Sequence, residues 1–315
     1  AMQLVESGKL TLDEPVAKHF PEFANLQVLT GFDQRTGAPV LRQAGRPILL
    51  RHLLTHTSGF AYDTWNEKLL RYSKQAGRTN ELAPLLFEPG AQWDYGTSTD
   101  WTGRLVEAVS GVSLEGYFQR RILQPLAMKD TSFILPPEKF GRLVSSYARQ
   151  GDGSLKEERR TQPPMPKSFS GGGGLYSTAG DYVRFMQMIL RLGVTAGGER
   201  ILQEKTVRMM QSNQIGEVSA GKMKSFRRDR SSDVDFHPGH KDGFTYGFLI
   251  NGAAYDGRRS AGSLAWAGLL NTFFWIDPSS SLCAVAMMQF LPFCDQDAIG
   301  MLGDFERAIY RAVRP

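Results

Sequence analysis

The chain has few cysteines and no long hydrophobic run. Two cysteines in 315 residues exclude a disulfide scaffold, and Cys283 and Cys294 lack the CxxC spacing of a metal or redox site. No apolar stretch reaches the roughly 18 residues of a membrane-spanning helix, and no signal peptide is visible. The sequence therefore predicts no membrane partner and leaves the compartment open between cytoplasm and periplasm.

The chain also has no large excess of charge of either sign. The chain has 37 Lys+Arg against 32 Asp+Glu, a net charge of +5. The densest basic run, from Lys222 to Arg230, is short and lacks the succession of aromatic residues that forms a stacking platform for bases. We expect a solvated loop here and no nucleic-acid partner.

Several catalytic and ligand-binding motifs are missing. No Gly-x-Ser-x-Gly elbow of an α/β-hydrolase occurs, and no Gly-Lys-Ser/Thr follows the four glycines at 171–174, which excludes a phosphate loop. His237 and His240 flank a Pro-Gly turn without a nearby pair of carboxylates. His52 and His56 have the spacing of a zinc helix without its glutamate, so we expect hydrogen-bonded structural roles for them. The sequence predicts no metal and no cofactor.

The composition is that of a globular protein, with 41% hydrophobic and 22% charged residues. Up to about residue 240 the patterns favour helices and loops. The predicted helices are a helix from Ser98 or Thr99, as its cap, to Ser110 with Gly111 as its stop, a helix from Ser113 to Leu123, and a helix capped by Thr178 that runs to Leu192 before Gly193.

Beyond residue 240 the pattern changes to short β-rich runs at 245–251, 263–270, 272–277 and 282–290, which predict an antiparallel meander. The stretch 295–313 predicts a helix that packs on this sheet through Ile299, Leu302, Ile309 and Val313. We therefore expect an α/β domain from residues 1–22 and 241–315, and a mainly helical domain from residues 23–240.

One loop has a chemically informative context. Alone, Tyr95 would be a half-buried aromatic residue in the loop Trp93-Asp94-Tyr95-Gly96-Thr97-Ser98. Here the segment Phe87-Glu88-Pro89-Gly90-Ala91-Gln92-Trp93-Asp94-Tyr95 leads into a capped helix. The arrangement resembles the second motif of the penicillin-recognising serine hydrolases, in particular the class C β-lactamases and the family VIII carboxylesterases. Thr97 stands where that motif has Asn or Ser.

Three further segments resemble the same family in the same order. They are the block Arg51-His52-Leu53-Leu54-Thr55-His56-Thr57-Ser58-Gly59-Phe60, the turn Gly172-Gly173-Gly174-Leu175-Tyr176-Ser177-Thr178-Ala179-Gly180-Asp181, and Trp266-Ala267-Gly268 at the place of the third motif. The resemblance covers essentially the whole chain. It implies a class C β-lactamase-like fold, α/β plus all-α, in which helices flank an antiparallel sheet and a helical domain is inserted.

The family's nucleophile motif, Ser-x-x-Lys, is not at its expected place. Residues 1–8 resemble the last turns of a helix, so we expect the serine, its lysine and the first strands upstream of Ala1. One Ser-x-x-Lys does occur, at Ser219-Ala220-Gly221-Lys222. Gly221 disfavours a helix there, and the segment follows the tyrosine motif instead of preceding it.

The resemblance implies an acyl-enzyme mechanism. The upstream serine attacks an ester or lactam carbonyl, and Tyr95 takes its proton as general base, with a lysine ammonium lowering the tyrosine pKa. The oxyanion is bound by the backbone N–H groups of the serine and of Leu269. Trp266, Ala267, Gly268 and Thr97 would contact the substrate, a small-molecule ester or β-lactam.

Trp266 replaces the lysine of the β-lactamases. An indole offers one N–H donor and no full charge, which favours neutral esters over anionic antibiotics. The sequence therefore predicts a carboxylesterase for short-chain acyl esters with weak β-lactam hydrolysis. Two further functions remain open, a β-lactamase or D-alanyl-D-alanine peptidase and a catalytically inactive penicillin-binding-like module. The oligomeric state is not predicted.

Overall fold

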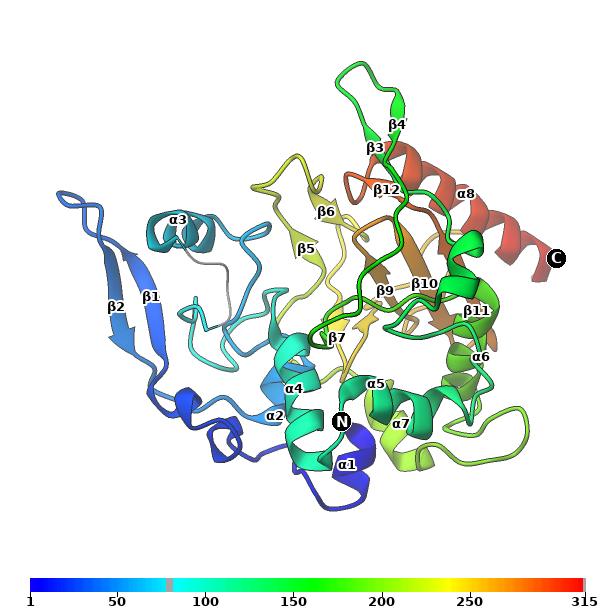
Figure 1. Cartoon of the computed structure of the whole chain (residues 1–315), viewed down its shortest axis with the longest axis horizontal. Coiled ribbons are helices and arrows are strands. Elements are labelled where there is room, and N and C mark those ends of the chain that lie inside the picture. Colours follow the sequence, from blue (N-terminus) through cyan, green and yellow to red (C-terminus); the bar gives the residue numbers. More distant parts are fainter. Residues whose placement is uncertain (78–81, 314–315) are drawn as a thin grey trace.

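Helices and short strands follow one another along the chain (Figure 1). The computed structural model describes residues 1–77 and 82–313. The α-helices are α1 (Met2–Glu6), α2 (Leu50–Leu54), α3 (Glu67–Ala76), α4 (Ser98–Ser110), α5 (Leu114–Phe118), α6 (Ala179–Leu190), α7 (Glu204–Met210) and α8 (Gln296–Val313). The strands are β1 (Gln27–Phe32), β2 (Pro39–Gln43), β3 (Tyr147–Arg149), β4 (Leu155–Glu157), β5 (Lys222–Met223), β6 (Val234–Asp235), β7 (Gly243–Phe244), β8 (Leu249–Ile250), β9 (Leu264–Gly268), β10 (Thr272–Asp277), β11 (Leu282–Met287) and β12 (Phe290–Leu291).

The largest sheet has five antiparallel strands in the order β11-β10-β9-β8-β7. Side chains alternate between its two faces, as the geometry of a strand requires. On β10, Phe273 and Trp275 belong to one hydrophobic cluster, whereas Phe274 and Ile276 belong to another. Both faces of this strand are therefore covered, which explains its nearly uninterrupted apolar sequence.

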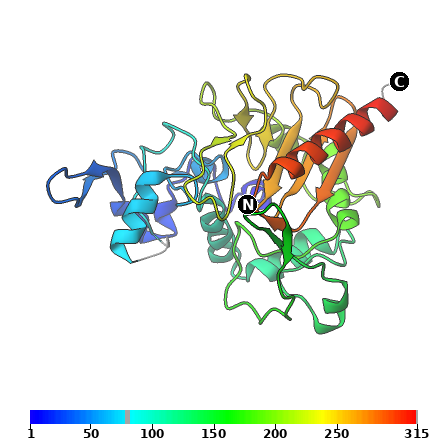
Figure 2. The ribbon, with the colours of Figure 1, turned by 90° about the horizontal axis from the view of Figure 1, so that it is seen from above.

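Helices cover the two faces of this sheet. Leu302 and Tyr310 of α8 share the cluster of Trp275, and Figure 2 shows α8 lying across the strands. On the other face, Met186 and Ile189 of α6 pack in the cluster of Ile276. The result is the antiparallel sheet flanked by helices that the resemblance predicts, and it fixes the position of β9.

The ends of the helices follow local chemistry. Helix α4 ends at Ser110, and Gly111 follows with φ +71°, as the sequence predicts. The predicted cap of this helix is wrong: Thr97 is the N-cap residue, and neither Ser98 nor Thr99 caps the helix. Thr178 does cap α6, because its hydroxyl accepts the N–H of Asp181 at 3.2 Å.

The helix predicted from Ser113 to Leu123 contains a change of geometry. Ser113 caps it by accepting the N–H of Gly116 at 3.2 Å, and α5 follows. Residues Gln119–Leu123 then continue as a π-helical turn. A widened turn of this kind cannot be inferred from a hydrophobic pattern, because that pattern differs little between the two geometries.

Two of the predicted strands are shorter than their sequence runs. In the run 245–251 only Leu249–Ile250 forms a strand, and the run 282–290 is divided between β11 and β12. Strand β12 pairs with β3 in a parallel arrangement and belongs to a separate three-stranded sheet. The chain leaves the large sheet because Phe290 bonds instead to residues 270 and 271 of the β9–β10 turn.

The predicted inner face of α8 is partly wrong. Leu302 is buried, but Ile299 and Val313 are exposed. The helix instead buries the row Ala298, Leu302, Glu306 and Tyr310, whose members are spaced by four residues. Glu306 occupies this row although it is charged, because Arg259 binds it. A hydrophobic pattern cannot anticipate such a pairing.

Residues 23–240 also contain β-structure. Strands β1 and β2 form an antiparallel hairpin that extends from the rest of the molecule (Figure 1), and β3 and β4 form a second one. The division into 1–22 with 241–315 and 23–240 stays a prediction, and its residues 78–81 and 314–315 lie outside the described part. No helix within that part is long and apolar enough to cross a membrane.

The pairing of Glu306 with Arg259 is expected to be essential for stability. Glu306 is fully buried and accepts the Arg259 N–H, Nε and Nη2 at 3.1, 2.7 and 2.9 Å. Glu306→Ala leaves a buried guanidinium unpaired and should lower the free energy of unfolding by about 3 to 5 kcal/mol in urea titrations. The matched control is Asp304→Ala, which removes an exposed pair with Arg307 and should cost at most about 1 kcal/mol. Equal losses in the two variants would contradict this role.

Candidate active site

A cavity of about 430 Å³ lies where the end of β9 meets several loops. It is lined by Tyr62, Asp63, Thr64, Trp65, Tyr95, Gly172, Met223, Arg227, Arg230, Phe236, Trp266, Ala267, Gly268, Leu269 and Phe293. The structure thus brings together the predicted general base Tyr95 and the predicted residues 266–269. These residues are far apart in sequence, and their convergence is the reason to treat this cavity as the active site.

Thr97 lies near this group but is not among the residues that line the cavity. It precedes α4, and its carbonyl accepts the N–H of Trp101 at 3.1 Å. Contact between Thr97 and substrate stays a prediction. Its neighbour Gly96 is required by packing, since a Cβ at this position would overlap the backbone of Ala61. This close approach sets the path of the loop that carries Tyr95.

Tyr95 and Trp266 are in direct contact. Their ring centroids are 4.8 Å apart at 59°, so the indole, which carries a single N–H donor, lies against the phenol ring. Burial raises the pKa of Tyr95 above its usual value, the Trp266 indole N–H opposes this rise, and the Asp100 carboxylate adds to it. Trp266 therefore acts on the predicted base, a role that its position in the third motif did not indicate.

His56 packs against the loop 93–97, called here the tyrosine loop, which carries Tyr95. Its ring lies 4.7 Å from that of Tyr95, Nδ1 accepts the N–H of Gly96 at 3.5 Å, and Nε2 lies 3.1 Å from the Thr99 hydroxyl. Burial lowers the His56 pKa to about 3, so the imidazole is neutral at neutral pH. Its hydrogen bonds therefore hold the loop without placing a positive charge beside Tyr95.

Two carboxylates flank the tyrosine loop. Burial raises the pKa of Asp94 to about 7, although Asn66 donates to it at 3.0 Å. Asp100 accepts the Tyr62 hydroxyl at 2.9 Å, the Gly172 N–H at 3.2 Å and the hydroxyl of Ser170. Asp100 thus ties the four-glycine turn to α4. Gly172 is needed here, because a Cβ would lie 2.7 Å from the Asp100 carboxylate.

The turn between β9 and β10 presents the predicted oxyanion donor. Gly268 pairs with Thr272, and the N–H of Asn271 closes the turn on the carbonyl of Gly268 at 3.0 Å. The N–H of Leu269 lies inside this turn and has no hydrogen-bond partner among the described residues. Since Leu269 also lines the cavity, its N–H is a free donor at the place where the resemblance requires one.

Asn271 holds this turn in place. It is fully buried with φ +61°, a conformation that asparagine tolerates better than most residues. Its Nδ2 donates to the carbonyls of Phe290 and Pro292 at 2.8 and 2.9 Å, and its Oδ1 accepts the N–H of Cys294 at 2.8 Å. Sequence reasoning missed Asn271. An asparagine before the second strand of a tight hairpin was the available signal.

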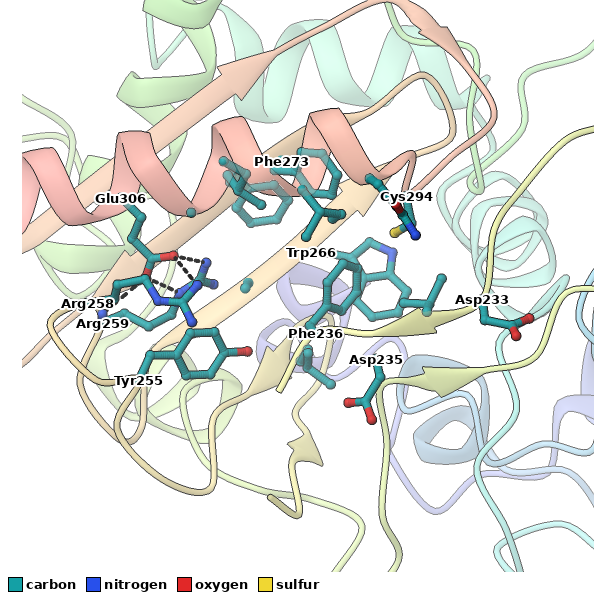
Figure 3. Close-up of a pocket in the computed structure, with 18 residues that line it drawn as sticks. Asp233, Asp235, Phe236, Tyr255, Arg258, Arg259, Trp266, Phe273, Cys294 and Glu306 are labelled. Atoms are coloured by element: carbon teal, nitrogen blue, oxygen red, sulfur yellow. Dashed lines mark hydrogen bonds and ion pairs between the residues drawn. The ribbon is translucent and has the colours of Figure 1, made fainter. Parts of the chain in front are cut away.

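A second cavity, of about 290 Å³, adjoins the first. The two share Phe236 and Trp266, and Figure 3 shows these rings at the centre of the second cavity. Its far end holds Tyr255 and the ion pair of Arg259 and Glu306. Trp266 therefore contributes to the walls of both cavities.

The internal Ser-x-x-Lys does not form a catalytic pair. Lys222 begins β5 and binds Asp235 at 3.2 Å, Ser219 is exposed, and Gly221 has φ +90°. No helical turn joins the serine to the lysine, as expected from Gly221. Likewise His237 binds Asp242 at 3.1 Å, and within residues 1–77 and 82–313 no group of three His, Cys, Asp or Glu could hold a metal ion.

The sheet, the tyrosine loop and the strand with Trp266-Ala267-Gly268 define a β-lactamase-like fold. The Beta-lactamase family model matches residues 1–299, and the chain belongs to this family. The fold class that the resemblance implied is thereby confirmed.

Relatives and solved structures agree with this assignment. The chain is 32% identical to the monacolin J acid methylbutanoyltransferase of Aspergillus terreus, over 98% of this chain and 78% of that protein. It is 31% identical to the lovastatin esterase of Penicillium rubens, over 99% of this chain and 81% of that protein. Simvastatin synthase (LovD) from Aspergillus terreus superposes with a TM-score of 0.83 at 29% identity, covering 99% of this chain and 80% of that one. These relatives are enzymes of the β-lactamase fold, acyltransferases and an esterase.

Asn271 gives a test of the turn. Asn271→Gly keeps access to positive φ but leaves the Phe290 and Pro292 carbonyls and the Cys294 N–H without their partner. We expect a loss of about 2 to 4 kcal/mol in the free energy of unfolding, measured by urea denaturation. Asn25→Gly, at an exposed position, should change it by about 0.5 kcal/mol or less. A tolerated Asn271→Gly would show that the turn does not depend on this side chain.

Proposed function

We propose that the protein is a serine carboxylesterase of the family VIII type that hydrolyses short-chain acyl esters through an acyl-enzyme, with weak β-lactam hydrolysis as a side activity. The observation that supports it is the contact between Trp266 and Tyr95, whose ring centroids are 4.8 Å apart, beside the free Leu269 N–H. A neutral indole occupies the position of the β-lactamase lysine, so the third motif offers no full positive charge to an anionic antibiotic.

The chemistry has two halves. In the first, the serine expected upstream of Ala1 attacks the ester carbonyl while its proton passes to the Tyr95 oxygen. The Leu269 N–H binds the oxyanion, and the tetrahedral adduct then expels the alcohol, which takes the proton back. In the second half a water molecule repeats these steps on the acyl-enzyme and releases the acid.

Tyr95 needs a cation to act as a base. Its pKa is raised by burial, so the phenol is neutral at neutral pH in the described surroundings. No lysine is among the described residues that line the cavity. In the proposal the lysine of the upstream Ser-x-x-Lys supplies the charge, and a lysine ammonium at contact distance would lower the tyrosine pKa.

Acyl transfer to an alcohol is the second candidate function. It is favoured by the relatives named as methylbutanoyltransferases, at 30 to 32% identity. Transfer and hydrolysis share the acyl-enzyme and differ in the nucleophile that resolves it. Measuring the partition of a butanoyl group between water and an added alcohol separates the two functions.

A β-lactamase, a D-alanyl-D-alanine peptidase and an inactive penicillin-binding-like module each predict a different result. Faster turnover of nitrocefin than of simple esters would indicate a β-lactamase, and faster turnover of a D-Ala-D-Ala peptide would indicate a peptidase. Labelling the intact protein with a fluorophosphonate, followed by peptide mapping, locates the nucleophile. An absent label would favour the inactive module.

Tyr95→Phe tests the proposed base directly. The substitution removes the atom that accepts the serine proton, and we expect kcat/KM for p-nitrophenyl butyrate to fall by about 100- to 10,000-fold in the intact protein. Tyr72→Phe, on α3 and outside the cavity, is the matched control and should retain parental activity. Parental activity in Tyr95→Phe would exclude this tyrosine as the base.

Trp266→Phe tests the effect of the indole N–H on the base. The indole N–H favours the ionised phenol, so its loss raises the Tyr95 pKa, and a base with a higher pKa is deprotonated only at higher pH. The rising limb of kcat/KM against pH should therefore move to higher pH. Trp65→Phe alters the same cavity and keeps the Trp266 indole, so its profile should keep the parental midpoint. An unshifted profile in Trp266→Phe would mean that the indole N–H does not tune Tyr95.

A further inference from the structure

One wall of the active-site cavity is a basic loop, residues 223–236. It is attached at two places: the N–H of Phe226 donates to the Thr64 carbonyl at 2.8 Å, and the N–H of Ser232 donates to the Phe293 carbonyl at 2.8 Å. Strands β5 and β6 pair with each other at its base. The loop therefore presents its side chains to the cavity from a fixed backbone.

Two basic side chains of this loop, Arg227 and Arg228, have carboxylate partners, and Lys224 lies over the ring of Phe226. Arg227 lies 3.1 Å from Asp229 and 3.8 Å from Asp63, and Arg228 lies 3.0 Å from Asp233. The solvated loop expected from the sequence is thus largely neutralised by its own acidic residues.

Arg230 differs from these neighbours. It lines the cavity, it is exposed, and its guanidinium makes no hydrogen bond or ion pair with any residue in the described ranges. The other charged residues that line the cavity are Asp63 and Arg227, which face each other. Among the described residues that line the cavity, Arg230 is therefore the charged side chain that has no ion-pair partner.

We propose that Arg230 binds a carboxylate on the substrate, so that the preferred esters are those of molecules that also carry a free acid group. This inference rests on the proposed esterase function. A guanidinium presents paired N–H donors that match the two oxygens of a carboxylate. Trp266 belongs to β9 and Arg230 to the basic loop, so the proposal assigns the reacting carbonyl to the strand and the remote acid to the loop.

Matched esters show whether Arg230 recognises an acid and on which side of the ester. In the first pair the difference is on the alcohol: 4-(butanoyloxy)benzoate carries a carboxylate there, and its methyl ester is neutral. In the second pair the difference is on the acyl group: mono-(4-nitrophenyl) glutarate carries a carboxylate there, and 4-nitrophenyl pentanoate is neutral. Arg230→Gln should lower kcat/KM about five- to tenfold for at least one anionic ester and less than twofold for its neutral counterpart.

Two further variants test whether the preference for the anionic ester depends on the charge of Arg230. Arg230→Lys keeps the charge and should recover part of the preference for the anionic ester. Arg228→Gln removes a cation that pairs with Asp233 and does not line the cavity, so it should leave the preference unchanged. Equal losses in Arg228→Gln and Arg230→Gln would indicate a general field of the loop and would overturn the proposal.

A binding measurement separates this inference from the proposed function. The affinities of 4-hydroxybenzoate and of its methyl ester, followed by quenching of tryptophan fluorescence, do not require turnover. The parent should prefer the acid, and Arg230→Gln should lose that preference. A parent that cleaves no ester contradicts the esterase, whereas equal binding of the acid and the methyl ester, together with an unchanged preference for mono-(4-nitrophenyl) glutarate in Arg230→Gln, contradicts the role of Arg230.

Discussion

The contact between Tyr95 and Trp266 is the interaction on which the site depends. Tyr95 belongs to the loop before α4, and Trp266 belongs to β9 of the large sheet. Phe244 and Trp93 extend the same aromatic cluster, with ring centroids 5.4 and 6.2 Å from Trp266. Because closely packed rings in edge contact have little freedom to shift, this cluster sets the position of Tyr95 relative to the turn that carries Leu269. The proposed catalytic geometry is therefore a consequence of how a helical region packs on a sheet.

The packing that positions Tyr95 also removes water from it. Burial disfavours the charged forms of three neighbouring groups: it raises the pKa values of Tyr95 and Asp94 and lowers that of His56. Tyr95 is thus surrounded by a neutral imidazole and an indole N–H, and the Asp100 carboxylate raises its pKa further. A site with so little water stabilises a developing charge only where a specific group supplies a hydrogen bond or an opposite charge. The Leu269 N–H and the expected lysine are the two groups that have this task in the proposed reaction.

The sequence predicted the parts of the molecule that depend on local signals. Gly111 ended α4, Thr178 capped α6, and ordered motifs identified the family and the residues that meet in the cavity. Contacts between distant segments were not predictable in this way. Glu306 entered the buried row of α8 because Arg259, on another element, neutralises it. The role of Asn271 likewise depends on a segment about twenty positions later in the chain.

The Asn271 side chain has a consequence for the engineering of this scaffold. It holds the turn that presents Leu269, and it also holds the segment 290–294, from which Phe293 forms a wall of the cavity. Enlarging the cavity by moving that segment would displace the N–H proposed to bind the oxyanion. In the proposed reaction, substrate range and turnover are thus mechanically coupled at this edge.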